Sequence, residues 1–413
     1  MREMKDSRIP WLGAIPSTWN CIRGKYILRY ITKPVREDDG VITCFRDGEV
    51  TLRSKRREEG FTMADKEIGY QGIDVGDLVV HGMDGFAGAI GISDSRGKAS
   101  PVLNVLDSKQ NKKYLMYYLR SMAYGNVFLA LSTGIRVRSC DLRWNKLAEI
   151  RYPVPSLEEQ EKITNYLDCK CEEIDKLIVD IQAQIDTLEQ HKKSIVIEVV
   201  TKGLNPDAPM KDSGIQWIGE IPQMWDCIRG KYILQYISKP TREDDGVITC
   251  FRDGEVTLRS KRREDGFTMA DKEVGYQGID VGDLVVHGMD GFAGAIGISD
   301  SRGKASPVLN VLETKQNKRY IMYFLRSMAY GDVFMALATG IRVRSCDLRW
   351  NKLAELFYPV PPIEEQNAIV EHIDRVISET NAVIAAKKEQ ISTLEAYKKS
   401  VIFEYVTGKK EVV

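Results

Sequence analysis

The sequence predicts an α+β chain with two near-identical mixed α/β domains joined by two long helices, which form an antiparallel coiled coil with approximate two-fold symmetry. Two observations predict this fold class. One long segment is written twice at an offset of 206 positions, and each copy is followed by a stretch with apolar residues every three or four positions. The predicted boundaries are 1–155 for the first body, 156–203 for the first helix, 204–361 for a linker and the second body, and 362–413 for the second helix.

The repeat is a duplicated domain. The string TGIRVRSCDLRWNKL occupies residues 133–147 and returns letter for letter at 339–353. Between Arg36 and Lys146 the two copies differ at only ten positions, mostly by mild exchanges such as Ile68 for Val274. A period of this length is too long for a solenoid repeat, so a whole folding unit has been copied.

Each body has the pattern of a mixed α/β domain. Short runs such as DLVVHG (77–82) and GAIGIS (88–93) are separated by Gly and Asp and predict strands joined by turns. The run NKKYLMYYLRSMAYGNVFLAL (111–131) predicts one or two helices. The hydrophobic fraction of 43% is sufficient for each half to bury its own core.

Residues 156–202 contain neither Gly nor Pro, and they predict the first long helix. Ser156 begins a capping box (SLEE), and Gly203 followed by Pro206 ends the helix. In the second copy Pro362 suits the first helical position and Gly408 ends the helix. The predicted seam consists of Leu167, Cys171, Ile174, Ile178, Ile181, Ile185, Leu188, Ile195 and Val199 in the first helix, and of Ile369, Ile373, Val376, Val383, Ile391, Leu394, Val401 and Tyr405 in the second.

The order of the segments predicts how the helices pair. The first helix leads away from the first body and the second leaves the second body, so helices that share a seam must run antiparallel. Two near-identical bodies at the ends of such a pair have an approximate two-fold axis, and the chain is expected to mimic a homodimer.

Composition excludes several classes of protein. The formal net charge of zero counts against a surface that binds phosphate everywhere, although it allows local basic patches. No apolar run is long enough for a membrane span, and no N-terminal signal peptide is visible. Eight cysteines without a Cys-x-x-Cys pair predict reduced thiols, and a cytoplasmic protein is expected.

Several motifs resemble a known family. IPWLGAIPSTW (9–19), IQWIGEIPQMW (215–225), YPVPSLEEQEKITNYLD (152–168), YPVPPIEEQNAIVEHID (358–374) and VGDLVV (75–80) resemble specificity subunits of type I restriction–modification systems. The resemblance implies two target recognition domains that each read one half of a split double-stranded DNA target, with the helices as a ruler between them. It also implies two modification subunits that methylate adenine, and restriction subunits that cleave DNA. No cofactor is then expected in this chain, because S-adenosylmethionine, ATP and Mg bind the partner subunits.

The residues themselves favour a subunit that is not an enzyme. An Asn/Asp-Pro-Pro-aromatic motif for methyl transfer is absent, and so is a Gly-x-x-x-x-Gly-Lys-Ser/Thr loop for nucleotide. A coiled-coil scaffold that reads no DNA sequence is the alternative. A self-contained restriction–methylation enzyme would need a catalytic domain, for which the repeats leave no room.

Arginine binds two acceptors on a guanine or a phosphate, so duplicated basic clusters are candidates for DNA contact. The end of a strand before glycines, which carries a His, a Met and an Asp, is a second candidate for contact with base edges, although a structural turn fits the sequence equally well. The lysines at 109, 112 and 113 are interpreted as a solvated face. The predicted DNA-binding residues of the first copy are Arg53, Lys55, Arg56, Arg57, His81, Met83, Asp84, Arg136, Arg138 and Arg143. Those of the second copy are Arg259, Lys261, Arg262, Arg263, His287, Met289, Asp290, Arg342, Arg344 and Arg349.

The near identity of the two bodies also predicts the symmetry of the target. Duplex DNA has two-fold axes perpendicular to its length, and a reader with two like heads binds half-sites related by such an axis. Half-sites that are inverted repeats, read in the major groove and separated by unspecified bases, are therefore expected.

Overall fold

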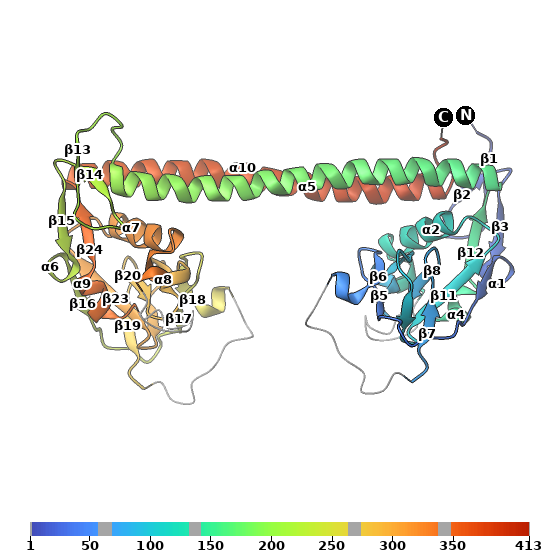
Figure 1. Ribbon diagram of the computed structural model, residues 1–413, viewed down its shortest axis with the longest axis horizontal. Helices are drawn as coiled ribbons and strands as arrows, with labels where there is room; N and C mark the ends of the chain where they lie inside the picture. Colours follow the sequence, from blue (N-terminus) through green and yellow to red (C-terminus); the bar gives the residue numbers. More distant parts are fainter. Residues whose placement is uncertain (1, 57–67, 132–141, 263–273, 338–347, 413) are drawn as a thin grey trace. The chain divides into compact units, whose positions relative to one another are not determined.

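The structure is a computed structural model that describes residues 2–56, 68–131, 142–262, 274–337 and 348–412 (Figure 1). It divides into two compact units. The first contains Met1–Ile181 with Lys388–Val413, and the second contains Gln182–Lys387. Each long helix contributes one part to each unit.

The first unit is built on a four-stranded antiparallel sheet with the order β4-β11-β8-β9. Its strands are β4 (Leu28–Tyr30), β11 (Leu103–Ser108), β8 (Leu78–His81) and β9 (Ile90–Ile92). Two-stranded pairs surround it: β1 (Met4–Asp6) with β2 (Ala14–Pro16), β3 (Asn20–Arg23) with β12 (Arg151–Val154), β5 (Ile42–Cys44) with β6 (Val50–Leu52), and β7 (Gln71–Ile73) with β10 (Gly97–Ala99). The shorter helices are α1 (Gly24–Ile27), η1 (Arg53–Lys55), η2 (Gly85–Ala87), α2 (Lys112–Tyr124), α3 (Val127–Ala130) and α4 (Trp144–Leu147).

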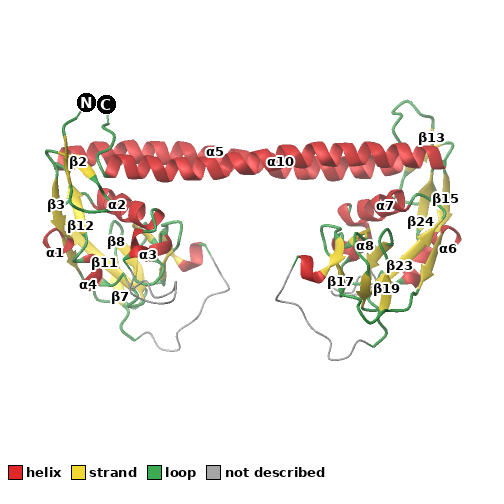
Figure 2. Cartoon of the chain, turned by 180° about the vertical axis from the view of Figure 1, so that it is seen from behind, coloured by secondary structure: helices red, strands yellow, loops and turns green. Residues whose placement is uncertain are grey.

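The second unit repeats this arrangement, with the sheet order β16-β23-β20-β21 (Figure 2). Its strands are β13 (Met210–Asp212), β14 (Glu220–Pro222), β15 (Asp226–Arg229), β16 (Leu234–Ile237), β17 (Ile248–Cys250), β18 (Val256–Leu258), β19 (Gln277–Ile279), β20 (Leu284–His287), β21 (Ile296–Ile298), β22 (Gly303–Ala305), β23 (Leu309–Thr314) and β24 (Phe357–Val360). Its shorter helices are α6 (Gly230–Ile233), η4 (Arg259–Lys261), η5 (Gly291–Ala293), α7 (Lys318–Tyr330), α8 (Val333–Ala336) and α9 (Trp350–Glu355). The predicted mixed α/β content of both bodies is confirmed.

Strand β8 shows why each body needs two cores. Leu78 and Val80 face the cluster that includes α2, whereas Val79 faces the cluster that includes β5 and β6, and all three side chains are fully buried. Successive side chains of a strand point to opposite faces, so both faces of this sheet are covered. The apolar run LVV is therefore buried on both sides, as a central strand requires.

Helix α2 packs between the sheet and the long helices of its unit (Figure 1). Asn111 begins it, because its side-chain oxygen accepts hydrogen bonds from the backbone N–H groups of Lys113 and Tyr114. The buried hydroxyl of Tyr114 lies 2.9 Å from the carbonyl oxygens of Pro153 and Val406. One side chain thus joins α2 to β12 and to the last turn of a long helix.

The long helices are α5 (Leu157–Lys202) and α10 (Ile363–Val406). As predicted, Gly203 ends α5, and its backbone φ of +76° is a conformation that favours glycine. Helix α10 begins one residue later than predicted, because Pro362 only caps it: its carbonyl accepts from the N–H groups of Glu365 and Gln366. Within the described residues, none of the helices combines the length and the apolar character needed to cross a bilayer.

The predicted capping box is only half formed. The Ser156 hydroxyl accepts from the backbone N–H of Glu159 at 3.3 Å. The Glu159 carboxylate instead accepts from the indole N–H of Trp19 at 3.0 Å and pairs with Arg2. Gln160, which is fully buried, donates to the side chain of Gln110 and to the Pro155 carbonyl. The Glu-Glu-Gln motif therefore attaches the body to its helix.

In each unit the two helix segments run antiparallel. In the first unit Tyr166 stacks on Tyr405 with ring centroids 4.4 Å apart, and Asp175 pairs with Lys398 at 2.7 Å, so residue numbers rise on one helix as they fall on the other. In the second unit the same order holds, because Gln184 contacts Lys387 and Lys192 contacts Asn381.

The predicted seam is wrong at one described position. Val383 is 45% exposed, and the neighbouring Ile384 is buried instead. The preceding buried position of the helix is Thr380, which is not apolar. A seam predicted from the apolar residues alone is therefore displaced by one residue here. Half of the other seam residues, including Leu167, Ile185 and Ile373, are buried as predicted, and the remaining ones are half-buried.

Candidate nucleic-acid interface

The turn that follows β8 is organised by His81. Its Nδ1 accepts hydrogen bonds from the backbone N–H groups of Met83 at 3.2 Å and of Asp84 at 2.9 Å. An imidazole that accepts at Nδ1 is neutral and carries its hydrogen on Nε2, and burial lowers the pKa of His81 below its usual value. His81 thus shapes the turn, whereas Met83 stands 56% exposed at its surface.

The first basic cluster lies on and just after η1, and its described members have partners within the body. Arg53 donates from Nε to the hydroxyl of Thr43 at 3.1 Å, and Lys55 donates to the hydroxyl of Ser95 at 2.7 Å. Lys55 also lies 3.5 Å from the carboxylate of Asp94. These contacts attach η1 to the neighbouring strands and turns.

Arg56 is held most firmly. Its two terminal nitrogens donate to the two carboxylate oxygens of Asp47, and Nη1 also lies 2.8 Å from Glu49. The guanidinium stacks on the ring of Phe45 with its central carbon 4.3 Å from the ring centroid. Hydrogen bonding to Arg56 lowers the pKa of Asp47. Arg56 therefore braces the turn between β5 and β6.

The second unit reproduces these contacts around a depression of about 540 Å³. Arg262 pairs with Asp253 and Glu255 and stacks on Phe251, as Arg56 does in the first copy. The depression is lined by Thr249, Cys250, Phe251, Arg252, Asp253, Arg262, His287 and Asp290. The structure therefore brings together the two predicted groups, the basic cluster and the His-Met-Asp turn, although they lie far apart in the sequence.

Sequence reasoning missed one arginine in each body, and in the second body this arginine lines the depression. Arg46 lies in the turn between β5 and β6, is 69% exposed, and donates from Nη2 to Asp84 at 2.9 Å. Arg252 makes the same bond to Asp290 at 2.8 Å. The signal was available, because the string CFRDGE places this arginine at a turn between two strand-like runs.

The last predicted arginines are placed only in part. Arg143 lies directly after Leu142, whose N–H donates to the Gly82 carbonyl at 2.8 Å, so Arg143 is next to the His-Met-Asp turn. Arg349 has the same position in the second copy, where Leu348 donates to Gly288. The remaining predicted residues lie outside the described part of the chain: Arg57, Arg136, Arg138, Arg263, Arg342 and Arg344.

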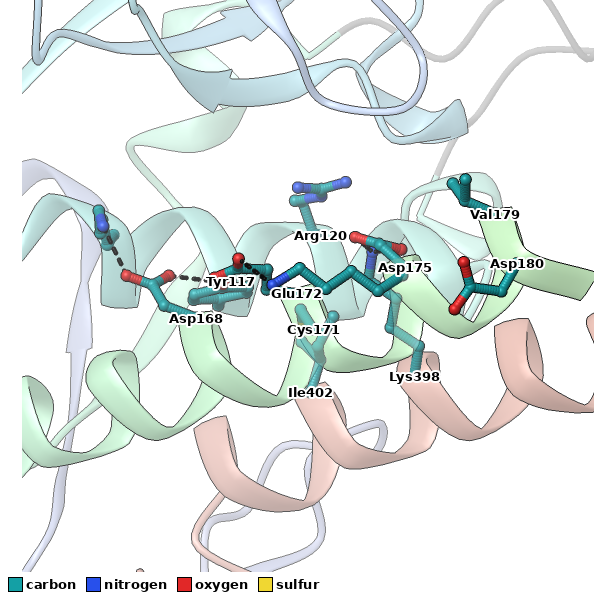
Figure 3. Close-up of a pocket in the computed structure, with 12 residues that line it drawn as sticks. Tyr117, Arg120, Asp168, Cys171, Glu172, Asp175, Val179, Asp180, Lys398 and Ile402 are labelled. Atoms are coloured by element: carbon teal, nitrogen blue, oxygen red, sulfur yellow. Dashed lines mark hydrogen bonds and ion pairs between the residues drawn. The ribbon is translucent and has the colours of Figure 1, made fainter. Parts of the chain in front are cut away.

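Two of the lysines interpreted as a solvated face also form ion pairs. Lys113 on α2 pairs with Asp168 on α5 at 2.5 Å, and Lys112 pairs with Asp107 at 3.1 Å. Figure 3 shows the groove of about 760 Å³ between α2 and the long helices of the first unit, where Asp168 also accepts from the hydroxyl of Tyr117 at 2.8 Å. The two contacts of Asp168 join α2 of the body to α5, whereas the Lys112 pair lies within the body.

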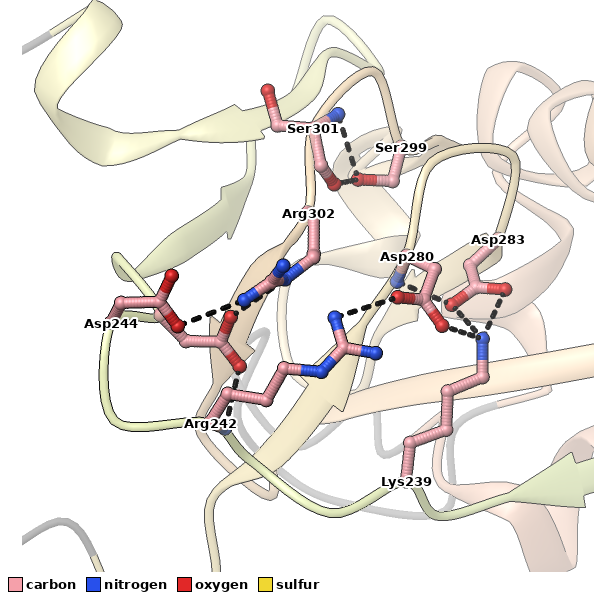
Figure 4. Close-up of polar contacts among 9 residues, drawn as sticks. Lys239, Arg242, Asp244, Asp280, Asp283, Ser299, Ser301 and Arg302 are labelled. Carbon is pink, nitrogen blue, oxygen red and sulfur yellow. Dashed lines mark hydrogen bonds and ion pairs between the residues drawn. The ribbon is translucent and has the colours of Figure 1, made fainter.

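A second charged network lies in each body beside the loop that precedes β5 or β17. In the second copy Lys239 pairs with Asp280 and Asp283, and Arg302 pairs with Asp244 and Asp245 (Figure 4). Each cation of the network faces at least one carboxylate, so the network fixes the loop on β19 and β22. Among the described residues, no group of three or more His, Cys, Asp or Glu side chains is arranged to hold a metal ion.

Comparison with known proteins places this geometry in context. No family model matches the chain. The chain is 25% identical over 335 residues to the putative type I restriction enzyme MjaX specificity subunit of Methanocaldococcus jannaschii, covering 75% of this chain and 72% of the relative. It is 24% identical over 420 residues to the type I restriction enzyme MjaVIII specificity subunit of the same organism, covering 96% of this chain and 94% of the relative.

Solved structures agree on the fold. The HsdS subunit from Thermoanaerobacter tengcongensis matches with a TM-score of 0.50 and 15% identity over 96% of this chain and 98% of that one. A chain described under complex assembly and conformational transition of the type I R-M system matches with a TM-score of 0.67 and 14% identity over 96% of this chain and 99% of that one. The resemblance to type I restriction specificity subunits that the sequence motifs predict is confirmed, and it extends along nearly the whole chain.

Proposed function

We propose that this chain is the DNA sequence-specificity subunit of a type I restriction–modification complex. Each body binds one half of a bipartite double-stranded target in the major groove. The observation that carries the proposal is a set of contacts found in both bodies, which brings together an exposed arginine, a histidine-organised turn and a solvent-exposed methionine. Arginine and apolar contacts are the usual means of reading base edges in the major groove.

The architecture of the proposal is a coiled coil that carries one body at each end, with an approximate two-fold axis between them. The antiparallel contacts within each unit support it, and so does the near identity of the two sets of depression contacts. Two like readers related by such an axis bind inverted repeats, because duplex DNA has the same symmetry. The coiled-coil scaffold without DNA reading is the less favoured alternative, since it gives no reason for the same arginine and histidine contacts in both bodies.

The catalytic steps belong to other subunits in this proposal. Two modification subunits methylate adenine with S-adenosylmethionine, and restriction subunits use ATP and Mg to translocate and cleave DNA. This chain is not an enzyme in the complex. It supplies the docking surface on the outer faces of its helices, and the complex is cytoplasmic.

The proposal is tested by producing the chain together with its modification subunits in a host that lacks adenine methylation, followed by mapping of N6-methyladenine in the host DNA. The expected result is one split motif whose halves are inverted repeats separated by unspecified bases. An asymmetric split motif would refute the proposed symmetry, and methylation without any split motif would refute the function. A host that carries the modification subunits alone is the control.

A further inference from the structure

The arginines beside the histidine-organised turn of each body are of two kinds. Arg56 uses both terminal nitrogens for Asp47, has Glu49 as a further partner, and stacks on an aromatic ring. Within the described part of the chain Arg46 makes one side-chain hydrogen bond, from Nη2 to Asp84, and it is 69% exposed. Arg46 therefore keeps N–H donors that can bind an acceptor outside the protein, whereas Arg56 already uses its donors within the body.

The partner of Arg46 decides which acceptor suits it. Its pair with Asp84 is neutral overall, and the carboxylate is 37% exposed beside the guanidinium. A phosphate is an anion and would be repelled by Asp84, whereas the edge of a base is neutral. A carboxylate that holds one terminal nitrogen also restricts the rotamers of a long side chain, which reduces the entropy lost on binding.

Guanine is the base that matches this geometry. Its major-groove edge presents two acceptors, O6 and N7, and a guanidinium contacts both at once. The contacts are the same in the second copy, where Arg252 is 68% exposed and bonded to Asp290 at 2.8 Å in a depression of about 540 Å³. Two hydrogen bonds from backbone N–H groups to His81 fix the turn that carries Asp84.

We propose that Arg46 and Arg252 each read one guanine in the half-site of their own body, and that Asp84 and Asp290 are positioning residues for them. This inference rests on the proposed function. Arg56 and Arg262 hold the hairpin that presents the reading arginine and make no base contact.

The test uses the complex of the full chain with its modification subunits and the doubly substituted variant Arg46→Ala with Arg252→Ala. Binding is measured on duplexes in which each base pair of a half-site is replaced in turn. The variant is expected to lose its preference for guanine at one position in each half-site. Affinity for the intact target falls roughly 5- to 100-fold per half-site, as expected when a bidentate arginine–guanine contact is lost. Affinity for duplexes already replaced at that position stays unchanged.

Two further measurements separate base reading from other roles. Replacing that guanine by 7-deazaguanine, which lacks the N7 acceptor, weakens binding of the wild-type complex and leaves the alanine variant unaffected. Asp84→Asn with Asp290→Asn keeps an acceptor oxygen but removes the negative charge, so the guanine preference weakens and the salt dependence of binding becomes steeper. A merely structural role of Asp84 would not change the salt dependence.

Arg29 provides a matched control. It is also an exposed arginine that donates from Nη2 to a carboxylate, that of Asp107 at 2.8 Å, but it lies on β4 and the second copy has Gln235 at this position. Arg29→Ala is expected to leave the guanine preference unchanged.

Two results would overturn the inference while the proposed function stands. The first is an unchanged guanine preference in the Arg46→Ala, Arg252→Ala variant. The second is an equal loss of affinity on every duplex, which is the behaviour of a phosphate contact. A wild-type complex that recognises no split motif would instead defeat the proposed function itself.

Discussion

Replacing Tyr114 by phenylalanine tests how the body is attached to the coiled coil. The Tyr114 side chain is fully buried, and its hydroxyl lies 2.9 Å from the carbonyl oxygens of Pro153 and Val406. Val406 is the last residue of α10, so its carbonyl has no acceptor role within the helix. Tyr114→Phe removes the shared donor and leaves both carbonyls in an apolar environment.

The expected loss is about 1–3 kcal/mol in the free energy of unfolding, the usual cost of an unsatisfied buried polar group. For a unit of this size each kcal/mol lowers the melting temperature by about 2–4 °C, so Tyr114→Phe lowers the transition of the first unit by about 2–12 °C. Differential scanning calorimetry of the full chain measures this shift. Tyr320→Phe should act likewise on the second unit, because its hydroxyl contacts the Val200 and Pro359 carbonyls.

Tyr118→Phe is the matched control. Its hydroxyl also donates to a carbonyl, that of Arg151 at 2.8 Å, but Arg151 is exposed and the second copy has Phe324 at the equivalent position. The expected cost is below about 1 kcal/mol, because water can satisfy the Arg151 carbonyl. If Tyr114→Phe lowers the melting temperature no more than Tyr118→Phe does, the proposed attachment through the hydroxyl is wrong.

Three other predictions follow from composition, titration and packing. The chain without modification subunits has zero net charge and should bind its target weakly and lose it as salt rises, which a fluorescence anisotropy titration at several salt concentrations measures. Burial lowers the pKa of His81 and His287 in the folded state, so their contribution to stability is present above the unfolded pKa of about 6.5 and is lost as the pH falls through the folded value. Melting temperatures between about pH 7 and pH 5 should therefore fall more steeply for the wild type than for the His81→Asn, His287→Asn variant, and equal slopes would contradict this. Gly91→Ala should destabilise the body severely, because the new Cβ would lie 1.9 Å from the Gly48 carbonyl oxygen, whereas Gly125→Ala, with its nearest contact at 3.4 Å, should leave the melting temperature nearly unchanged.

The long helices were easier to predict than the residues that their side chains contact, because the local spacing of apolar residues alone determines which face of a helix is apolar. The spacing from Leu167 onward predicts the apolar side of α5, where Leu167, Ile174 and Ile185 are buried and the other predicted residues are buried or half-buried. The same reasoning fails at Val383, which is exposed. The polar Thr380 occupies a buried position of the helix, so the apolar residues nearby no longer show which positions are buried. The second half of the capping box failed for a related reason: Glu159 bonds to Trp19, which is 140 residues away in the sequence.

The partners of the candidate DNA-binding residues could not be predicted from the sequence, because charge pairing in a body is not local in sequence. The cluster at 53–57 reads as a run of unpaired cations, yet Arg56 is neutralised by a residue nine positions away and Lys55 by one nearly forty positions away. The turn residues His81 and Asp84 were identified from the glycines beside them, but the arginine that Asp84 holds comes from another hairpin. A linear pattern shows where charges are dense, and only the fold shows which charges remain available.

The two copies also differ in a way that supports the division of roles. The ten exchanges between Arg36 and Lys146 leave every described residue of the depression unchanged, including the Arg46–Asp84 and Arg252–Asp290 pairs. The helices have exchanged many more residues, such as Tyr166 for His372 and Ile174 for Thr380. These exchanges change polarity as well as volume, so the helix positions accept changes that the arginine–carboxylate pairs of the bodies have not undergone. Under the proposed function, two bodies that keep the same contacts read the same half-site, and this is the physical reason for expecting an inverted repeat.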